Sequence, residues 1–87
     1  MSSTLDSIIV ICAEQSDHPA TADSNLVTDL GLDSLDLVSM TIAIEQQFPG
    51  IGAIDYDPAR METVLDVASF VEERLKLGAV TKAAASV

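Results

Sequence analysis

Three segments of the chain, at about residues 3–15, 33–47 and 63–77, share one local pattern. Each opens with Ser, Asp or Thr, followed three positions later by Asp, which is typical of a capped helix start. The three pairs are Ser3 and Asp6, Asp33 and Asp36, and Thr63 and Asp66. Apolar residues then recur at helical spacing, and no segment alternates convincingly as a strand does. The sequence therefore predicts an all-α fold.

The spacing of these helices predicts one small bundle. The chain has 87 residues, 48% of them hydrophobic, and only three aromatic side chains, so the core is expected to be aliphatic. Turn-forming residues between the first two helices predict a long loop, and Asp57 followed by Pro58 predicts a very short additional helix. Gly78 predicts the end of the last helix. We expect the bundle to span residues 1–78 and residues 79–87 to form a flexible tail.

Charge is distributed very unevenly along the chain. The formal net charge is −10, and residues 1–59 contain ten acidic residues and no basic one, whereas residues 60–87 contain four of each. Such a field repels nucleic acids and anionic lipids and attracts partners with a basic patch. Acidic surfaces also keep small proteins dissolved, which is the simpler interpretation of the charge.

The single cysteine, Cys12, excludes an internal disulfide and a cysteine-based zinc site, and fits a reducing compartment. The N-terminal "MSSTLDS" lacks the basic and apolar regions of a signal peptide. No apolar run approaches the ~20 residues of a membrane span. We therefore expect a cytoplasmic protein with no membrane span.

Catalytic and metal-binding residues are scarce. Cys12 lies on the apolar stripe of the first helix, where a buried small side chain is the better interpretation than a reactive thiol. His18 is the only histidine and has no reason to approach Ser34, so no Ser–His–Asp arrangement is predicted. Asp55 and Asp57 are explained by turns and caps. We expect no metal site and no intrinsic enzyme activity.

The second helix has two apolar stripes, on roughly opposite sides. One consists of Leu37, Met40, Thr41, Ile44 and Phe48, and the other of Leu35, Val38 and Ile42, with Ser39 and Gln46 beside it. A helix on the outside of a small bundle needs only one apolar face for the core. The second stripe is expected to face a partner, the alternative being a central helix that is buried on both sides.

The first helix is also unusually apolar. Its main stripe consists of Leu5, Ile8, Ile9 and Cys12. Val10 and Ile11 are interpreted as lying off this stripe. They predict an extra contact through the first helix, either with a partner or in a weak dimer, although the protein is expected to be mainly a monomer.

The segment "LGLDSLD", residues 30–36, places Ser34 between two aspartates at the predicted start of the second helix. Either the serine helps to begin the helix, or its hydroxyl is displayed for attachment. A helix start favours phosphate because of its free N–H groups and its dipole. Gly31 permits a tight approach turn, and Leu30 and Leu32 can anchor the preceding loop.

The sequence "DLGLDSLD", followed by "VSMTIAIEQQF" and by "METVLDVASFVEERL" as a last helix, resembles the acyl carrier proteins. The resemblance covers roughly residues 4–77. It implies that Ser34 receives 4′-phosphopantetheine from coenzyme A, transferred by a separate synthase. The thiol of this group then holds acyl chains as thioesters, for delivery to enzymes of a lipid or polyketide-type pathway.

The resemblance also implies roles for other residues. The partner-binding surface would consist of Asp33, Leu35, Asp36, Val38, Ser39, Ile42 and Glu45. The cleft for the acyl chain would be lined by Leu37, Met40, Ile44 and Phe48. The expected partners are the phosphopantetheinyl transferase, an acyl-loading enzyme, and an acyltransferase or ketosynthase with a basic docking patch.

The chain departs from the family pattern in its charge. Familiar carriers of fatty acid synthesis have several glutamates along the second helix, whereas here Glu45 is the only acid after Asp36. This difference favours a specialised carrier in a dedicated pathway. Two alternatives remain open at this point, an aminoacyl or peptidyl carrier and an unmodified acidic adaptor.

Overall fold

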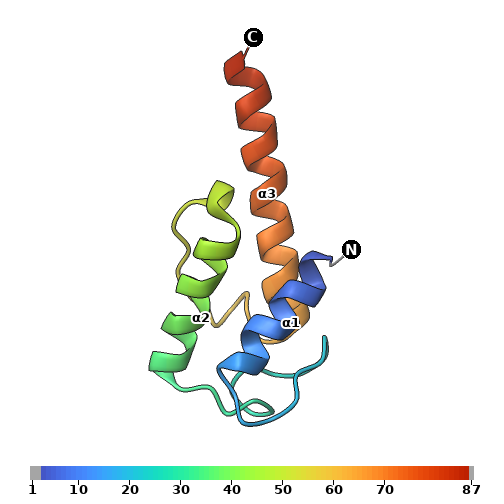
Figure 1. Ribbon diagram of the computed structural model, residues 1–87, viewed down its shortest axis with the longest axis vertical. Coiled ribbons are helices and arrows are strands. Elements are labelled where there is room, and N and C mark those ends of the chain that lie inside the picture. The colour runs from blue at the N-terminus through green and yellow to red at the C-terminus, as the bar shows by residue number, and fades with distance from the viewer. Residues whose placement is uncertain (1–2, 87) are drawn as a thin grey trace.

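The computed structural model describes the backbone of residues 3–86 and the side chains of residues 3–77. Its elements, in chain order, are α1 (Thr4–Glu14), α2 (Ser34–Gln47), the 3₁₀ helix η1 (Pro49–Ile51) and α3 (Val64–Ser86) (Figure 1). Strand-like pairing in the described residues is limited to an isolated bridge between Asn25 and Thr63. The predicted all-α bundle is confirmed. None of the helices within residues 3–86 combines the length and apolarity that crossing a membrane requires.

Reciprocal side-chain hydrogen bonds start all three main helices, as the sequence predicts. Before α1, the Asp6 N–H donates to Ser3 Oγ at 3.1 Å, and the Ser3 N–H donates to Asp6 Oδ2 at 3.3 Å. Before α3, the Asp66 N–H donates to Thr63 Oγ1 at 3.2 Å, and the Thr63 N–H donates to Asp66 Oδ2 at 3.1 Å. Each pair satisfies two of the backbone donors that a helix start leaves open.

Helix α1 is the element that joins the bundle. It packs against both α2 and α3, whereas α2 and α3 do not approach each other closely within the described residues and meet through η1 instead. Ile8 and Cys12 on α1 are fully buried. The buried core is aliphatic, as expected, and consists of Ile8, Ile11, Cys12, Leu26, Leu30, Leu32, Leu37, Met40, Ile44, Ile51, Ile54, Met61, Val64, Val67, Ala68 and Val71.

Backbone hydrogen bonds tie the long first loop to the start of α3. The Leu26 N–H donates to Glu62 O at 2.9 Å, and the Val64 N–H donates to Ser24 O at 3.0 Å. Closer to α2, Leu30 and Leu32 are buried, as the sequence predicts. Between them Gly31 has a φ of 66°, a left-handed conformation that favours glycine. The loop that leads to Ser34 is therefore fixed by hydrogen bonds to the residues around the start of α3 and by the burial of Leu30 and Leu32.

The short helix predicted at Asp57 and Pro58 is wrong. Residues 58–60 form a turn, in which the Arg60 and Met61 N–H groups donate to Asp57 O at 3.0 and 2.8 Å. Met61 is fully buried, and the following residue is hydrogen-bonded to the first loop, so the chain leaves the helical path after one turn. The short helix of this fold is instead η1, which directly follows α2.

The predicted end of the last helix at Gly78 is also wrong, because α3 continues to Ser86 (Figure 1). One glycine costs about 1 kcal/mol in a helix, and the alanine-rich residues that follow favour the helical conformation. The flexibility expected for residues 79–87 remains a prediction, since the side chains after Leu77 lie outside the described residues.

The apolar pair predicted on the first helix is only half correct. Val10 is 57% exposed, but Ile11 is only 4% exposed and belongs to the core. Because α1 packs against two helices, its buried face is wider than the single stripe that the spacing predicts. The proposed extra contact through α1 therefore has only Val10 to support it.

Glu45 on α2 holds the segment that follows η1. Its Oε2 accepts a hydrogen bond from the Ile54 N–H at 2.8 Å, and Ile54 is buried. This contact fixes the connection between α2 and α3 near the core. A carboxylate that the sequence analysis assigns to partner binding thus has a structural function.

We predict that Glu45→Ala lowers the free energy of unfolding by about 1–2 kcal/mol, because the buried Ile54 N–H loses its acceptor. Glu45→Gln keeps an acceptor oxygen and should lose less. Urea denaturation measures both, with Gln46→Ala as the control, since Gln46 is an exposed neighbour and should change stability by less than about 0.5 kcal/mol. Equal stability of the Glu45→Ala and Gln46→Ala proteins would contradict this role.

Candidate functional site

Asp33, not Ser34, caps α2. The Asp36 N–H donates to Asp33 Oδ1 at 2.9 Å, and the Asp33 N–H donates to Asp36 Oδ2 at 3.2 Å. Ser34 is the first residue of the helix and is exposed. The Ser34 side chain therefore does not cap the helix, although the residue occupies its first position. Its hydroxyl is free of a capping function and lies at the surface.

The same hydrogen bonds leave two backbone donors open beside Ser34. A helix start has four N–H groups without an intrahelical acceptor, which here belong to residues 33–36. The capping pair satisfies those of Asp33 and Asp36. The N–H groups of Ser34 and Leu35 remain for solvent or for a ligand. The positive end of the helix dipole lies at the same place.

The second apolar stripe of α2 faces solvent. Leu35 is 77% exposed, Val38 53% and Ile42 48%, and Ser39 between them is exposed as well. The alternative of a central helix buried on both sides is thus excluded. The prediction that this stripe faces solvent is therefore confirmed.

The opposite stripe of α2 forms part of the core. Leu37, Met40 and Ile44 are 7%, 0% and 0% exposed, respectively, and Phe48 is half-buried. The side-chain position predicted from helical spacing is therefore confirmed for these residues. The two described cavities are lined by other residues, so a role for this stripe in lining an acyl cleft remains a prediction.

The acidic residues assigned to partner binding differ in their accessibility. Asp33 is exposed, whereas Asp36 and Glu45 are half-buried. Glu45 is bound to the Ile54 N–H, as described above. The carboxylates of Asp33 and Asp36 also form the capping bonds of α2, so they stabilise the helix start in addition to carrying negative charge there.

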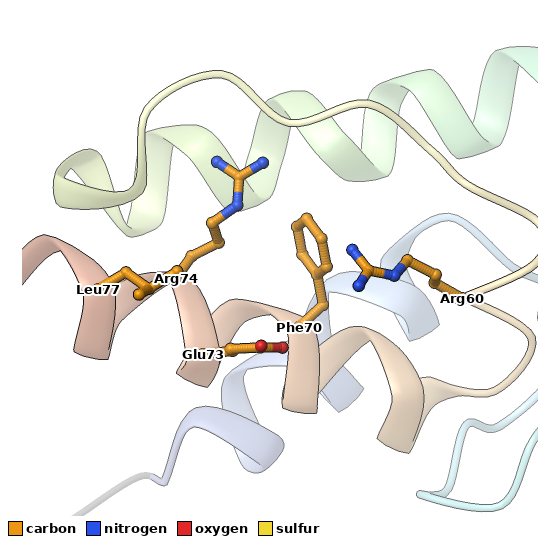
Figure 2. Close-up of a pocket in the computed structure, with 5 residues that line it drawn as sticks. All are labelled: Arg60, Phe70, Glu73, Arg74 and Leu77. Carbon is orange, nitrogen blue, oxygen red and sulfur yellow. The ribbon is translucent and has the colours of Figure 1, made fainter.

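Sequence reasoning missed two further features of the surface. Val27 and Leu65 are exposed apolar residues, at 51% and 46%. Leu65 lies outside the buried stripe of the last helix, so the helical spacing contained this signal, but Val27 lies in a loop where no spacing applies. The second feature is a cavity beside α3 lined by Arg60, Phe70, Glu73, Arg74 and Leu77 (Figure 2).

Cys12 is a buried side chain, in agreement with the interpretation of the sequence. Its Sγ lies 3.7 Å from Met40 Sδ, between α1 and α2. Burial raises the pKa of the Cys12 thiol from 9.0 to about 12, because the thiolate would lose its hydration. The thiol therefore stays protonated at neutral pH, in a form that is a poor nucleophile.

Comparison with known proteins matches residues 6–72 to the family described as "Phosphopantetheine attachment site". The matched range includes Ser34. The chain belongs to the acyl carrier protein family. Similar relatives, each named "Acyl carrier protein", come from Bdellovibrio bacteriovorus, Thermotoga maritima and Solidesulfovibrio magneticus. No solved structure matches the chain significantly.

Each of these relatives is 40% identical to the chain over 52–55 residues. The matched segments cover 60–63% of this chain and 65–69% of the relatives. Membership of the family gives the chain an acyl carrier role and a covalent 4′-phosphopantetheine group. It also implies contact with a phosphopantetheinyl transferase and with acyl-handling enzymes.

The cap of this carrier can be tested separately from its surface charge. We predict that Asp33→Ala lowers the free energy of unfolding by about 1 kcal/mol, while Asp33→Asn, which keeps the accepting oxygen, has a smaller effect. Asp23→Ala removes the same charge from an exposed loop position and serves as the control. Thermal or urea unfolding measures the difference. A loss of similar size for Asp23→Ala would show that net charge, rather than the cap, determines the effect.

Proposed function

We propose that Ser34 is the residue to which 4′-phosphopantetheine is attached, and that this chain carries acyl intermediates as thioesters to enzymes of a lipid or polyketide-type pathway. The observation that supports this most strongly is the exposed Ser34 hydroxyl at the first position of α2, with the cap supplied by Asp33 instead. A side chain without a role in holding the fold can be modified without loss of structure.

The residues around Ser34 fit a phosphodiester. The open N–H groups of Ser34 and Leu35 and the helix dipole favour a negative group on the serine oxygen. The carboxylates of Asp33 and Asp36 oppose it, but each accepts a backbone hydrogen bond at 2.9 or 3.2 Å. When attached, the group supplies a thiol that forms thioesters. Within this protein the start of α2, fixed by the capping bonds of Asp33 and Asp36, determines the position from which the phosphopantetheine arm extends.

The exposed stripe of α2 is proposed as the surface on which partner enzymes bind. Leu35, Val38 and Ile42 supply apolar area directly after the attachment residue, and Ser39 lies among them. Asp33 and Asp36 at the start of the helix, within a chain of net charge −10, would attract basic residues of the partner. The apolar stripe would stabilise the complex, while the charges would mainly increase the association rate.

The buried stripe is proposed as the wall of the acyl cleft. Leu37, Met40, Ile44 and Phe48 lie on the side of α2 that faces the core. Met40 is fully buried, and its flexible side chain can adapt to an inserted chain. Within α2 only one acidic residue follows Asp36, which supports a specialised carrier. The partners of such a carrier would recognise the apolar stripe more than a series of acidic side chains along the helix.

The attachment residue is tested by incubating the protein with coenzyme A and a phosphopantetheinyl transferase. We expect intact-protein mass spectrometry to show one added phosphopantetheine group, which Ser34→Ala abolishes. Ser69→Ala is the matched control, because Ser69 is an exposed serine on α3, outside the proposed binding surface, and should leave the mass gain unchanged. An unchanged wild-type mass with several transferases would contradict the proposal. A Ser34→Ala protein that kept full function would instead support the unmodified adaptor.

The binding surface is tested by Val38→Ser. We predict that it lowers kcat/KM of the transferase by about tenfold, through loss of apolar contact. Val10→Ser is the matched control, since Val10 is 57% exposed and Val38 53%, on different helices. Added salt should reduce the rate for both variants, because it screens the acidic field. If Val10→Ser reduced kcat/KM as much as Val38→Ser, the α2 surface would not be the binding site.

A further inference from the structure

Two of the few basic residues of this acidic chain meet at one cavity. Arg60, from the turn before α3, and Arg74, on α3, line a cavity of about 240 Å³ together with Phe70, Glu73 and Leu77. Figure 2 shows the two guanidinium groups near the Phe70 ring, which lies between them, under the segment that connects α2 to α3. We call this site the Arg60–Arg74 pocket. It contains none of the residues proposed above for attachment, partner binding or the acyl cleft.

The guanidinium groups keep most of their hydrogen-bonding capacity. Arg74 lies over the Phe70 ring, with its Cζ 5.0 Å from the ring centre, and its NH1 donates to Ile51 O at 3.5 Å. No ion pair forms between either arginine and a carboxylate within residues 3–77. Each guanidinium has five N–H donors, so both retain donors for a ligand.

The nearby carboxylates only partly compensate this positive charge. Glu73 lines the pocket, and Asp66 lines an adjoining cavity of about 160 Å³ with Ser69. The Asp66 Oδ2 accepts hydrogen bonds from the Glu62 and Thr63 N–H groups, at 3.2 and 3.1 Å, and is thereby held at the start of α3. The Arg60–Arg74 pocket itself therefore contains two positive charges and one negative charge, the reverse of the balance elsewhere in the chain.

We propose that the Arg60–Arg74 pocket binds a carboxylate group on a short apolar stem. Guanidinium groups match the planar carboxylate, and Phe70 and Leu77 offer apolar contact for the stem. A fully apolar ligand would remove the two guanidinium groups from water without giving them a partner, which is unfavourable. Glu73 at the same cavity disfavours a doubly charged anion such as phosphate.

The carboxylate has two sources that share this chemistry. One is a free short-chain carboxylic acid in solution. The other is the far end of an acyl cargo that carries a terminal carboxylate, and this source rests on the proposed attachment at Ser34. The pocket would then select cargo with an acidic end over cargo with a methyl end.

The first experiment uses the unmodified protein, so its outcome is independent of Ser34. Hexanoate is titrated into ¹⁵N-labelled protein, and amide shifts are followed by NMR at moderate salt, where the Debye length of about 10 Å limits repulsion by distant acids. We expect saturable shifts around Arg60, Phe70 and Arg74. Hexanamide, which has the same stem without the charge, should bind at least about tenfold more weakly, equivalent to about 1.4 kcal/mol.

Arginine variants locate the binding site. Arg60→Gln combined with Arg74→Gln should weaken hexanoate binding at least about tenfold. Lys76→Gln is the matched control, since it removes one positive charge from an exposed position of α3 outside the pocket, and it should change the affinity by less than about twofold. Circular dichroism verifies that each variant is folded, and the single Arg60→Gln protein replaces the double variant if that one is not.

Three results would overturn the proposal: no saturable shifts with hexanoate, equal binding of hexanamide, or binding that the arginine variants leave unchanged. Tighter binding of inorganic phosphate than of hexanoate would overturn its selectivity for a carboxylate. A protein loaded on Ser34 with a cargo ending in a carboxylate, compared with its methyl ester, then identifies the source. If pocket amides shift for the carboxylate form of the cargo and not for its methyl ester, the bound carboxylate belongs to the cargo. If neither form shifts these amides while hexanoate still binds, the ligand is a free carboxylic acid.

Discussion

The packing of α1 against both α2 and α3 is the constraint on which the rest of this structure depends. Ile8 and Cys12 are fully buried there, and α1 is the α-helix that contacts both other α-helices within the described residues. Because α2 and α3 do not approach each other closely within the described residues, the connecting segments fill the space between them. Ile51, Ile54 and Met61 contribute their side chains to the core from these segments. The turns and loops of this fold are thus structural parts of the bundle.

This arrangement leaves α2 with one side in the core and the other in solvent. Met40 and Ile44 are fully buried, whereas Leu35 and Val38 are more than half exposed. At its start the helix relies on Asp33 and Asp36, and the serine between them has no part in the cap. The cap and the proposed attachment site therefore depend on different atoms within the same four residues.

Much of this could be predicted from the sequence, because helical spacing and caps are local signals. The three capping pairs, the extent of α2 and the two faces of α2 all follow from neighbouring residues, and the structure agrees. The errors arise where distant residues decide. Asp57 and Pro58 have the local pattern of a helix start. However, Glu62 O accepts a hydrogen bond from the Leu26 N–H in the first loop, and this contact takes the place of a continued helix. Ile11 is buried in the core cluster, which the spacing of apolar residues within α1 does not reveal.

The site shows the same division. The exposure of Ser34 and of the apolar stripe follows from helical geometry. The hydrogen bond from the Ile54 N–H to Glu45, in contrast, joins two segments whose contact no local sequence pattern indicates. The Arg60–Arg74 pocket is likewise invisible in the sequence, since its arginines are 14 positions apart and meet only after the turn at residues 58–60 has formed.

The independence of the cap from Ser34 has a consequence for how other proteins recognise this carrier. Since the serine oxygen supports no part of the helix start, attachment at Ser34, as proposed here, should leave the loaded and unloaded forms with one backbone conformation and nearly the same melting behaviour. Enzymes that act on only one form then have no difference in shape to detect. Their discrimination must come from direct contact with the arm itself and with whatever it holds.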